Sequence, residues 1–247
     1  MLSFSSEEIT MIRINLVSGP RNISTALMYS FAQRADTVVL DEPYYAFYLH
    51  NSGVDHPGKD EVLKSQPISE EEVSKKIFAT GTNEILFIKN MAHHLELMDQ
   101  SFVERVTNVF LIRDPRLILA SYSQVIEAPT LRDIGIEYQY NLFNRLKKLG
   151  QQPVVMDSGV ILKDPESVLK KLCVSLGISF MKEMLHWRPG PKEYDGVWAK
   201  YWYSNVHKSK GFEVQPTSNR PLGAHLRTVN DQAQYYYDQL LSFSLQP

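Results

Sequence analysis

The chain has 247 residues, with 26 Lys plus Arg and 28 Asp plus Glu, so its formal net charge is −2. This balance gives no electrostatic footprint for nucleic acid or for an anionic membrane, and a hydrophobic content of 43% excludes a disordered, collagen-like or coiled-coil chain. The single cysteine, Cys173, excludes an internal disulfide framework and a cysteine-rich zinc site. The first ten residues contain no basic segment leading into an apolar run, and no run of eighteen apolar residues occurs, so we expect a cytoplasmic protein without membrane association.

Five short apolar runs predict β-strands, at 12–17, 37–40, 84–88, 107–112 and 153–156. Because the runs lack polar alternation, they are typical of strands buried on both faces of a sheet. Helical patterns lie between and after them, at 22–34, within 70–79, and at 115–127, 131–149 and 164–176. This alternation predicts an α/β fold with a central parallel sheet flanked by helices, and no repeat or linker divides residues 1–247 into more than a single domain. Ligands of such sheets bind beyond the carboxyl ends of the strands.

The first predicted strand is followed by the segment 18–25, SGPRNIST, which runs directly into a helix. A turn with Gly-Pro and a helix start that carries Arg21, Asn22, Ser24 and Thr25 offer an anion backbone N–H groups, a helix dipole and side-chain donors. The pattern therefore predicts a phosphate or sulfate cradle, although it lacks the spacing and the lysine of a Walker motif. The alternative is an ordinary helix start, in which Asn22 or Ser24 caps backbone donors.

The fourth predicted strand ends in Arg113-Asp114-Pro115, and Ser121 follows eight residues after the arginine, two turns into the next helix. An arginine that leaves the end of a buried strand costs desolvation unless it meets an anion. A guanidinium with a hydroxyl nearby suits a terminal phosphate. The alternative is an ion pair between Arg113 and a carboxylate, with Ser121 facing its own helix.

Taken together, these segments resemble the two cofactor-binding signatures of the sulfotransferases: a first loop of the P-[RK]-S-G-[ST]-T type, and Arg-x-Pro followed by a serine. Lys89 stands where cytosolic members of that family carry the lysine of their Lys-Thr-His motif. The run 154–178, with its Asp-Pro and a helix that ends in Leu-Gly, and the run 232–241, QAQYYYDQLL, are similar to later parts of the family.

The resemblance implies a three-layer, P-loop NTPase-like α/β fold and 3′-phosphoadenosine 5′-phosphosulfate as the sulfuryl donor. It also implies a small molecule or glycan as the acceptor, with a hydroxyl or amine as the accepting group. Carried over by position, the 5′-phosphosulfate would be held by Arg21, Asn22, Ser24 and Thr25, and the 3′-phosphate by Arg113 and Ser121. Lys208 and Lys210 are a partial counterpart of the family's C-terminal Arg-Lys-Gly loop. The chain departs from the family at Ile23, where glycine is usual, and at Met91, where cytosolic members place the catalytic histidine.

Sulfuryl transfer requires a base for the acceptor hydroxyl and cations for the charge that develops on the leaving phosphate. Arg21 and Lys89 are the expected cations. Some members of the family, such as the tyrosylprotein enzymes, use a glutamate just after the second strand, and Glu42 stands there. His93 and His94 are the rival base. They are not expected to form a metal site, because adjacent side chains on a helix diverge.

The aromatic segment at about 187–225 is expected to cover the site, either over the adenine or around the acceptor; the alternative is a separate packing cluster. Two other functions stay open on the sequence. One is a P-loop kinase for a small metabolite, with Asp114 as a Mg²⁺ ligand. The other is a nucleotide-binding protein without catalysis, which the departures at Ile23 and Met91 would suit.

Overall fold

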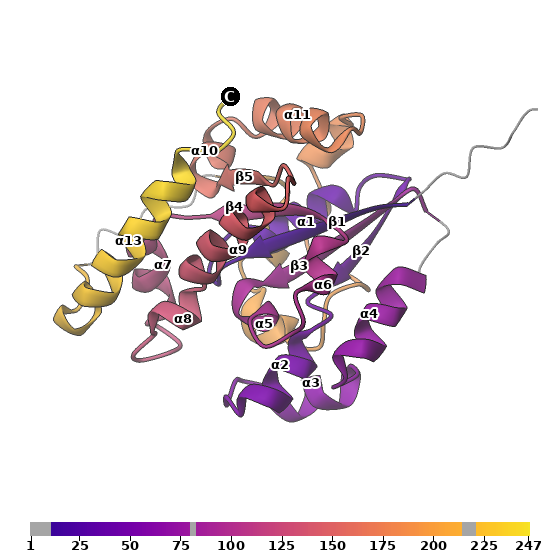
Figure 1. Cartoon of the computed structure of the whole chain (residues 1–247). Helices are drawn as coiled ribbons and strands as arrows, with labels where there is room; N and C mark the ends of the chain where they lie inside the picture. The colour runs from indigo at the N-terminus through magenta and orange to yellow at the C-terminus, as the bar shows by residue number, and fades with distance from the viewer. Residues whose placement is uncertain (1–10, 80–82, 214–220) are drawn as a thin grey trace, which may run out of the picture.

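The computed structural model of the chain describes residues 11–79, 83–213 and 221–247. Its central sheet contains β1 (Ile12–Ser18), β2 (Thr37–Asp41), β3 (Ile85–Met91), β4 (Thr107–Ile112) and β5 (Val154–Asp157). The strands lie in the order β2-β3-β1-β4-β5, and every neighbouring pair is parallel (Figure 1). The prediction of a parallel α/β sheet with these five strands is therefore confirmed. Because the order reverses on the two sides of β1, the loop after β1 lies where a ligand is expected.

The helices connect the strands and cover the sheet. Before β4 they are α1 (Ser24–Phe31), α2 (Tyr45–Ser52), α3 (Lys59–Ser65), α4 (Glu70–Ala79), α5 (Ala92–Leu95) and α6 (Ser101–Glu104). After β4 they are α7 (Pro115–Tyr122), α8 (Leu131–Ile134), α9 (Ile136–Lys148), α10 (Ser158–Lys163), α11 (Pro165–Leu176), α12 (Ala199–Trp202) and α13 (Arg227–Leu241). Short 3₁₀ turns occur at η1 (Lys182–Leu185), η2 (Val206–Lys208) and η3 (Ala224–Leu226).

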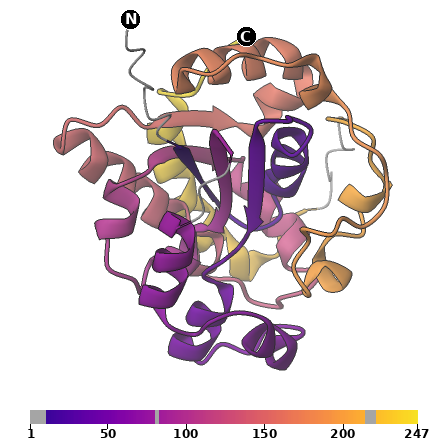
Figure 2. The same ribbon diagram turned by 90° about the vertical axis from the view of Figure 1, so that its right-hand side faces the viewer.

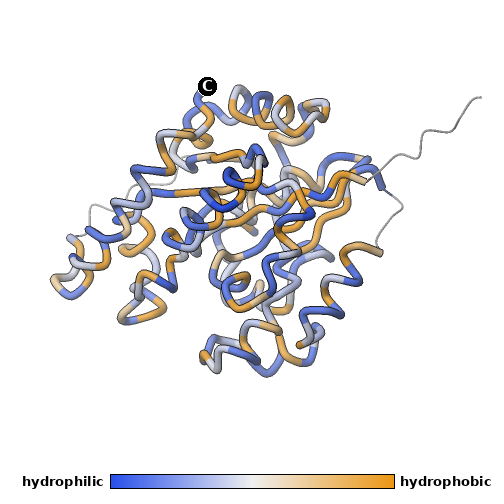
Figure 3. Tube along the Cα trace, in the orientation of Figure 1, coloured by the Kyte–Doolittle hydropathy of each residue, from blue (hydrophilic) through white to orange (hydrophobic). Residues whose placement is uncertain are grey.

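The sheet is buried on both faces, and successive side chains along each strand pack alternately into two hydrophobic cores, one on each face. Phe87 of β3 packs in one core with residues of α1 and α11, whereas Leu86 and Ile88 pack in the other with α7, α9 and α13. Figure 2 shows the helices on either side of the sheet, and Figure 3 shows the apolar strands between mixed, more polar helices. This three-layer arrangement explains the continuous apolar runs, since a strand covered on both sides has no polar face.

The prediction of one helix over 131–149 is wrong, because Gly135 separates α8 from α9. Gly135 has a φ of 68°, a left-handed conformation that glycine adopts without strain. A Cβ at this position would lie 2.7 Å from the Cβ of Ala92. The chain therefore turns here to let α8 pack beside α5. Two further predicted helices are shorter than expected, since α1 covers only part of 22–34 and α7 ends at Tyr122.

A chain of buried amides crosses the three central strands. Asn90 of β3 donates to the Oδ1 of Asn15 in β1 at 2.8 Å, and Asn15 donates to the Oδ1 of Asn108 in β4 at 2.9 Å. Asn108 in turn donates to the backbone carbonyl of Val103 at 2.6 Å. Buried polar groups are tolerated when they are paired, so this chain ties together the strands that carry the site.

No helix among the residues described combines the length and the apolar character needed to cross a membrane.

Candidate active site

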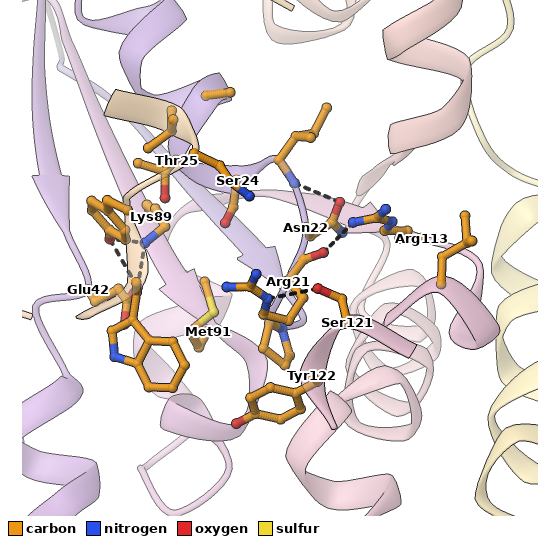
Figure 4. Close-up of a pocket in the computed structure, with 18 of the residues that line it drawn as sticks. Arg21, Asn22, Ser24, Thr25, Glu42, Lys89, Met91, Arg113, Ser121 and Tyr122 are labelled. Atoms are coloured by element: carbon orange, nitrogen blue, oxygen red, sulfur yellow. Dashed lines mark hydrogen bonds and ion pairs between the residues drawn. The ribbon is translucent and has the colours of Figure 1, made fainter. Parts of the chain in front are cut away.

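A cavity of about 450 Å³ opens at the carboxyl ends of β1, β3 and β4. Its lining comes from four places: the loop 20–23 with the first turn of α1, the ends of β2 and β3 with α5, the second half of α7, and the segment 202–213. Figure 4 shows its two chemically different ends, one with Arg21, Arg113 and Ser121 and one with Lys89 and Glu42. Most of the predicted site residues therefore meet in one cavity, although they are up to 100 positions apart in the sequence.

The loop after β1 is held in place by Asn22. Its Nδ2 donates to the carbonyl of Leu111 in β4 at 3.1 Å, and its Oδ1 accepts from the backbone N–H of Ile23 at 2.9 Å. Arg21 has a φ of 54°, an uncommon left-handed conformation for a residue with a side chain. Asn22 thus shapes the loop through protein contacts, and the bend at Arg21 directs that side chain across the cavity to α7.

Arg21, Arg113 and Ser121 form the cationic end of the cavity. The Nε of Arg21 donates to the Oγ of Ser121 at 3.0 Å, and the Nη1 of Arg113 donates to the backbone carbonyl of Arg21 at 2.5 Å. Burial lowers the pKa of both guanidinium groups, although an arginine stays charged at neutral pH. Within the described part of the chain, neither arginine forms an ion pair with a carboxylate. Two half-buried cations that line a cavity and have no carboxylate partner among the described residues indicate an anion site.

Ser24 and Thr25 occupy the first turn of α1, are buried, and line the cavity between its two ends (Figure 4). Backbone N–H groups of a first helical turn have no partner within the helix, and they carry the positive end of the dipole. Ile23 and Met91, the two departures from the sulfotransferase pattern, also line the cavity. At Ile23, the loop therefore presents an isoleucine to the cavity at a position where the family usually has glycine.

The other end of the cavity holds a buried cluster of one lysine and two carboxylates. The Nζ of Lys89 donates to the Oδ1 of Asp41 at 2.9 Å, to the hydroxyl of Tyr203 at 2.6 Å, and to the Oε1 of Glu42. A lysine has three N–H donors, so all of them are used within the protein. Burial works to lower the pKa of Lys89, but the two carboxylates raise it above its usual value. Lys89 is therefore a charged ammonium that holds Asp41 and Glu42 in position.

Glu42 is the carboxylate of this cluster that lines the cavity, whereas Asp41 does not line it. Glu42 follows β2 with a φ of 42°, and its backbone N–H donates to the carbonyl of Lys89 at 2.8 Å. Burial raises the pKa of Glu42, against the lowering effect of Lys89. Its second oxygen, Oε2, lies 3.8 Å from the Nδ1 of His94. The Glu42 side chain is buried in the site and does not simply face solvent at the turn that follows β2.

His93 and His94 are buried in α5 and line the same cavity. Their ring centroids lie 4.6 Å apart, so the prediction that adjacent histidines diverge here is wrong. The reason is that α5 is a single turn packed against α2, where Tyr45 stacks on His94 with centroids 4.5 Å apart. Burial lowers the pKa of His93 to about 3 and that of His94 well below its usual value. Both histidines are therefore neutral, and the described residues show no cluster that could hold a metal ion.

The aromatic segment reaches the cavity through Trp202, Tyr203 and Phe212. It passes beside α1 (Figure 2), where Tyr29 donates to the carboxylate of Asp195 at 2.7 Å. Residues 214–220 of the expected cover lie outside the described residues. Lys208 and Lys210 are exposed and do not line the cavity, so their contact with a cofactor stays a prediction.

Sequence reasoning missed three residues that organise the site. Asp41 was not singled out from the sequence, where its place directly after an apolar run was the available signal. Tyr203 lies in the expected aromatic segment but was not singled out within it. Gln139 of α9, with its amide oriented so that nitrogen donates, bonds the carbonyls of Val17 at 3.1 Å and Leu111 at 3.3 Å, at the ends of β1 and β4.

A nucleotide-sized cavity at the switch point of a parallel sheet, with an arginine pair at one end and a base candidate at the other, defines a P-loop-like group transferase. The family model described as "Sulfotransferase domain" matches residues 12–238, and the chain belongs to that family. The prediction of a sulfotransferase enzyme is confirmed at this level.

Two curated relatives from Arabidopsis thaliana are similar to most of the chain. "Branched-chain-amino-acid aminotransferase-like protein 1" is 40% identical over 197 residues, 79% of this chain and 35% of that protein. "Branched-chain-amino-acid aminotransferase-like protein 2" is 38% identical over 201 residues, 81% of this chain and 36% of that protein. The chain thus spans about a third of the length of the curated relatives it matches.

Solved structures show the same fold at low sequence identity. The sulfotransferase domain from the curacin biosynthetic pathway superimposes with a TM-score of 0.56 at 16% identity, over 96% of this chain and 99% of that one. A sulfotransferase from Alicyclobacillus acidocaldarius gives a TM-score of 0.53 at 14% identity, over 94% and 96% of the two chains. These similarities confirm the three-layer fold.

Proposed function

We propose that the chain transfers a sulfuryl group from 3′-phosphoadenosine 5′-phosphosulfate to a hydroxyl or amine of an uncharged small molecule. The observation that carries this proposal is the arginine pair, Arg21 and Arg113, which is half-buried, lines the cavity and has no carboxylate partner among the described residues. The arginine pair alone would be enough to bind a ligand with a single anionic group. The presence of a second set of donors at the start of α1 supports a ligand with two.

The residues of the cavity fit a donor of this kind. Arg113, Arg21 and Ser121 would hold the 3′-phosphate, because the hydrogen bond between Arg21 and Ser121 places both side chains at the same end. Ser24, Thr25 and the backbone N–H groups of the first turn of α1 would hold the 5′-phosphosulfate. Arg21 is thus proposed on the side of the 3′-phosphate, and its contact with the 5′ group, expected from the sequence, stays a prediction. Asn22 would act through the shape of the loop.

The bound donor would supply the sulfuryl group and a phosphate leaving group. Glu42 would accept the proton of the acceptor hydroxyl at its Oε2, because Oε1 is engaged by Lys89. The same lysine favours the ionised carboxylate that a base needs. For Lys89 to stabilise the leaving phosphate, it would exchange one of its three hydrogen bonds for a phosphate oxygen. His93 and His94 are neutral and would shape the wall of the acceptor end.

The acceptor end favours an uncharged ligand. Its walls are aromatic side chains, including Tyr45, Tyr122 and Trp202, together with neutral histidines. Lys89 is the cation there among the described lining residues, and its charge is already matched by Asp41 and Glu42. A carboxylate or phosphate on the acceptor would therefore be desolvated without a partner. A glycan acceptor stays an alternative only where its sugar is uncharged.

The names of the curated relatives suggest a second candidate, an aminotransferase. Such enzymes form a Schiff base through a lysine amine, and that amine must lose its proton. Lys89 is the lysine that lines the described cavity, and its two carboxylate partners hold it protonated. This geometry opposes a Schiff base, so we do not propose the activity for this chain.

Kinase chemistry has less support from the same residues. Asp114, the expected Mg²⁺ ligand, instead caps α7 by accepting from the backbone N–H of Arg116 at 2.8 Å, and it does not line the cavity. A protein that binds the nucleotide without catalysis differs from the proposed enzyme only in turnover, so the experiment must separate the two.

Calorimetric titration with adenosine 3′,5′-bisphosphate, with and without EDTA, tests the donor site. We expect saturable 1:1 binding that EDTA leaves unchanged, and no binding would overturn the proposal. Turnover is then measured with radiolabelled donor and pairs of acceptors matched in size, one neutral and one carboxylated. We expect transfer to neutral members only. Binding without transfer to any acceptor would favour the noncatalytic alternative.

A further inference from the structure

Tyr203 joins the aromatic segment to the carboxylate cluster through a hydroxyl whose hydrogen bonds are all used. The hydroxyl accepts from the Nζ of Lys89 at 2.6 Å and from the Nε1 of Trp198 at 3.1 Å, and it donates to the carboxylate of Asp41 at 2.8 Å. A hydroxyl has one donor and two acceptor positions. Tyr203 therefore satisfies three buried groups at once, from a position 162 residues after Asp41.

The same segment holds Asp41 from its other oxygen. The backbone N–H of Gly196 donates to the Oδ2 of Asp41 at 3.0 Å. Trp198 is buried and packs edge-on against Tyr45, with ring centroids 5.2 Å apart. A Cβ at position 196 would lie 2.1 Å from the ring of Trp198, so only glycine fits this approach. Residues 196–203, which we call the clamp, are thus fitted closely around Asp41.

Lys89 bonds both Asp41 and Glu42, and the clamp supplies further hydrogen-bond donors to Asp41. Asp41 receives hydrogen bonds from Lys89 and Tyr203 at Oδ1 and from Gly196 at Oδ2, so both of its oxygens are bonded. Glu42 shares Lys89, but its Oε2 has no hydrogen-bond donor among the described residues. The cluster thus has one fully bonded carboxylate, Asp41, and one carboxylate with an oxygen left for a ligand, Glu42.

We propose that Tyr203 is a positioning residue that holds Asp41 and Lys89 in place and thereby keeps Lys89 bonded to Glu42. The value of this role for catalysis rests on the proposed function, but the role itself does not. The groups that face Glu42 are Asp41 beside it, Lys89 from β3, His94 from α5 and Tyr203 from the clamp. Because the one proton of the Tyr203 hydroxyl is donated to Asp41, Tyr203 acts on Glu42 through Lys89: without Tyr203, Asp41 would lose a donor and draw the Lys89 ammonium away from Glu42.

The test measures the titration of Glu42 without acceptor or cofactor, by ¹³C NMR of protein labelled at the glutamate side-chain carboxyl. The Glu42 resonance is assigned by its loss in Glu42→Gln. In Tyr203→Phe we expect the midpoint of this titration to move to higher pH. The matched control is Tyr201→Phe, because Tyr201 is exposed in the same segment and its hydroxyl bonds Glu61 at 3.0 Å. An unchanged midpoint in folded Tyr203→Phe would overturn the proposal.

If Tyr203→Phe does not fold, Trp198→Phe replaces it, since that change keeps an aromatic ring but removes the donor to the Tyr203 hydroxyl. We expect a smaller shift in the same direction, and an unchanged midpoint would again count against the proposal. Where an acceptor is turned over, kcat/KM of Tyr203→Phe should fall roughly ten-fold on the acid limb of the pH profile, the effect of about one hydrogen bond. Affinity for adenosine 3′,5′-bisphosphate should stay unchanged. Failure of wild-type binding or turnover would refute the proposed function, while the NMR titration would still decide the role of Tyr203.

Discussion

Replacing Arg113 by alanine separates the two anion sites proposed for the donor. One N–H of Arg113 is spent on the backbone carbonyl of Arg21, and the rest of the guanidinium faces the cavity. Two charge-assisted hydrogen bonds to a 3′-phosphate, at about 1.5–3 kcal/mol each, make the loss that is specific to adenosine 3′,5′-bisphosphate roughly 3–6 kcal/mol. Loss of the hydrogen bond that holds the Arg21 loop would weaken the binding of any nucleotide by about 1 kcal/mol. We therefore expect about a five-fold loss for adenosine 5′-phosphate, and for the bisphosphate a further loss of roughly 150- to 25,000-fold.

Calorimetry with the two nucleotides on wild type and Arg113→Ala completes a thermodynamic cycle between this side chain and the 3′-phosphate. The matched control is Arg116→Ala, an exposed arginine one turn along that does not line the cavity; it should leave both affinities unchanged. Equal fold-losses for the two nucleotides in Arg113→Ala would show that the residue only supports the loop. In that case the assignment of the 3′-phosphate to this end of the cavity would be wrong.

Three further predictions concern the base, the buried amides and the histidines. Glu42→Gln keeps the shape of the side chain but removes its charge, so kcat should fall by about 10²- to 10⁴-fold with donor affinity nearly intact; an unchanged kcat would exclude Glu42 as the base. Asn15→Leu removes two buried hydrogen bonds and leaves the Nδ2 of Asn90 and the Oδ1 of Asn108 without a partner, so urea unfolding should show a loss of about 2–4 kcal/mol, and a loss below 1 kcal/mol would mean that the amide chain contributes little. Because the pKa of His93 is about 3 when folded and about 6.5 when unfolded, the unfolded chain binds the extra proton, and stability should fall by about 2 kcal/mol between pH 7 and pH 5 from this group alone. His93→Gln should lower the pH dependence of the free energy of unfolding by that amount, and parallel curves for the two proteins would contradict the assigned burial.

The sheet could be predicted from the sequence because each of its strands is buried on both faces, a condition that leaves a continuous apolar run. The helices α2 and α3 could not, since Tyr45–Ser52 carries no clean apolar stripe and its helical form depends on packing against α5 and the clamp. For the same reason the break at Gly135 was missed: the pattern continues through it, and only the contact with Ala92 shows why the chain turns.

The candidate site divides in the same way. Residues next to strand ends, such as Arg21, Glu42 and Arg113, could be predicted because the carboxyl edge of a parallel sheet is set by topology. Contacts across the chain could not: nothing in the local sequence indicates that Arg21 bonds Ser121 or that Tyr203 closes over Asp41. Such pairings depend on the spacing of the loops in space, which is a property of the packed layers.

Gln139 of α9 connects the ends of the two strands, β1 and β4, from which the loops with Arg21 and Arg113 begin. Its amide, with nitrogen as the donor, bonds the carbonyls of Val17 and Leu111, the next-to-last residues of β1 and β4, and the loops that carry Arg21 and Arg113 follow those strands. Through these two hydrogen bonds, α9 helps to set the distance between the loops that carry the two guanidinium groups. No residue of α9 lines the cavity. Gln139→Asn shortens the side chain and would remove these two hydrogen bonds without changing any residue that lines the cavity. The affinity for an anionic ligand could thus be adjusted by a substitution in α9, outside the cavity.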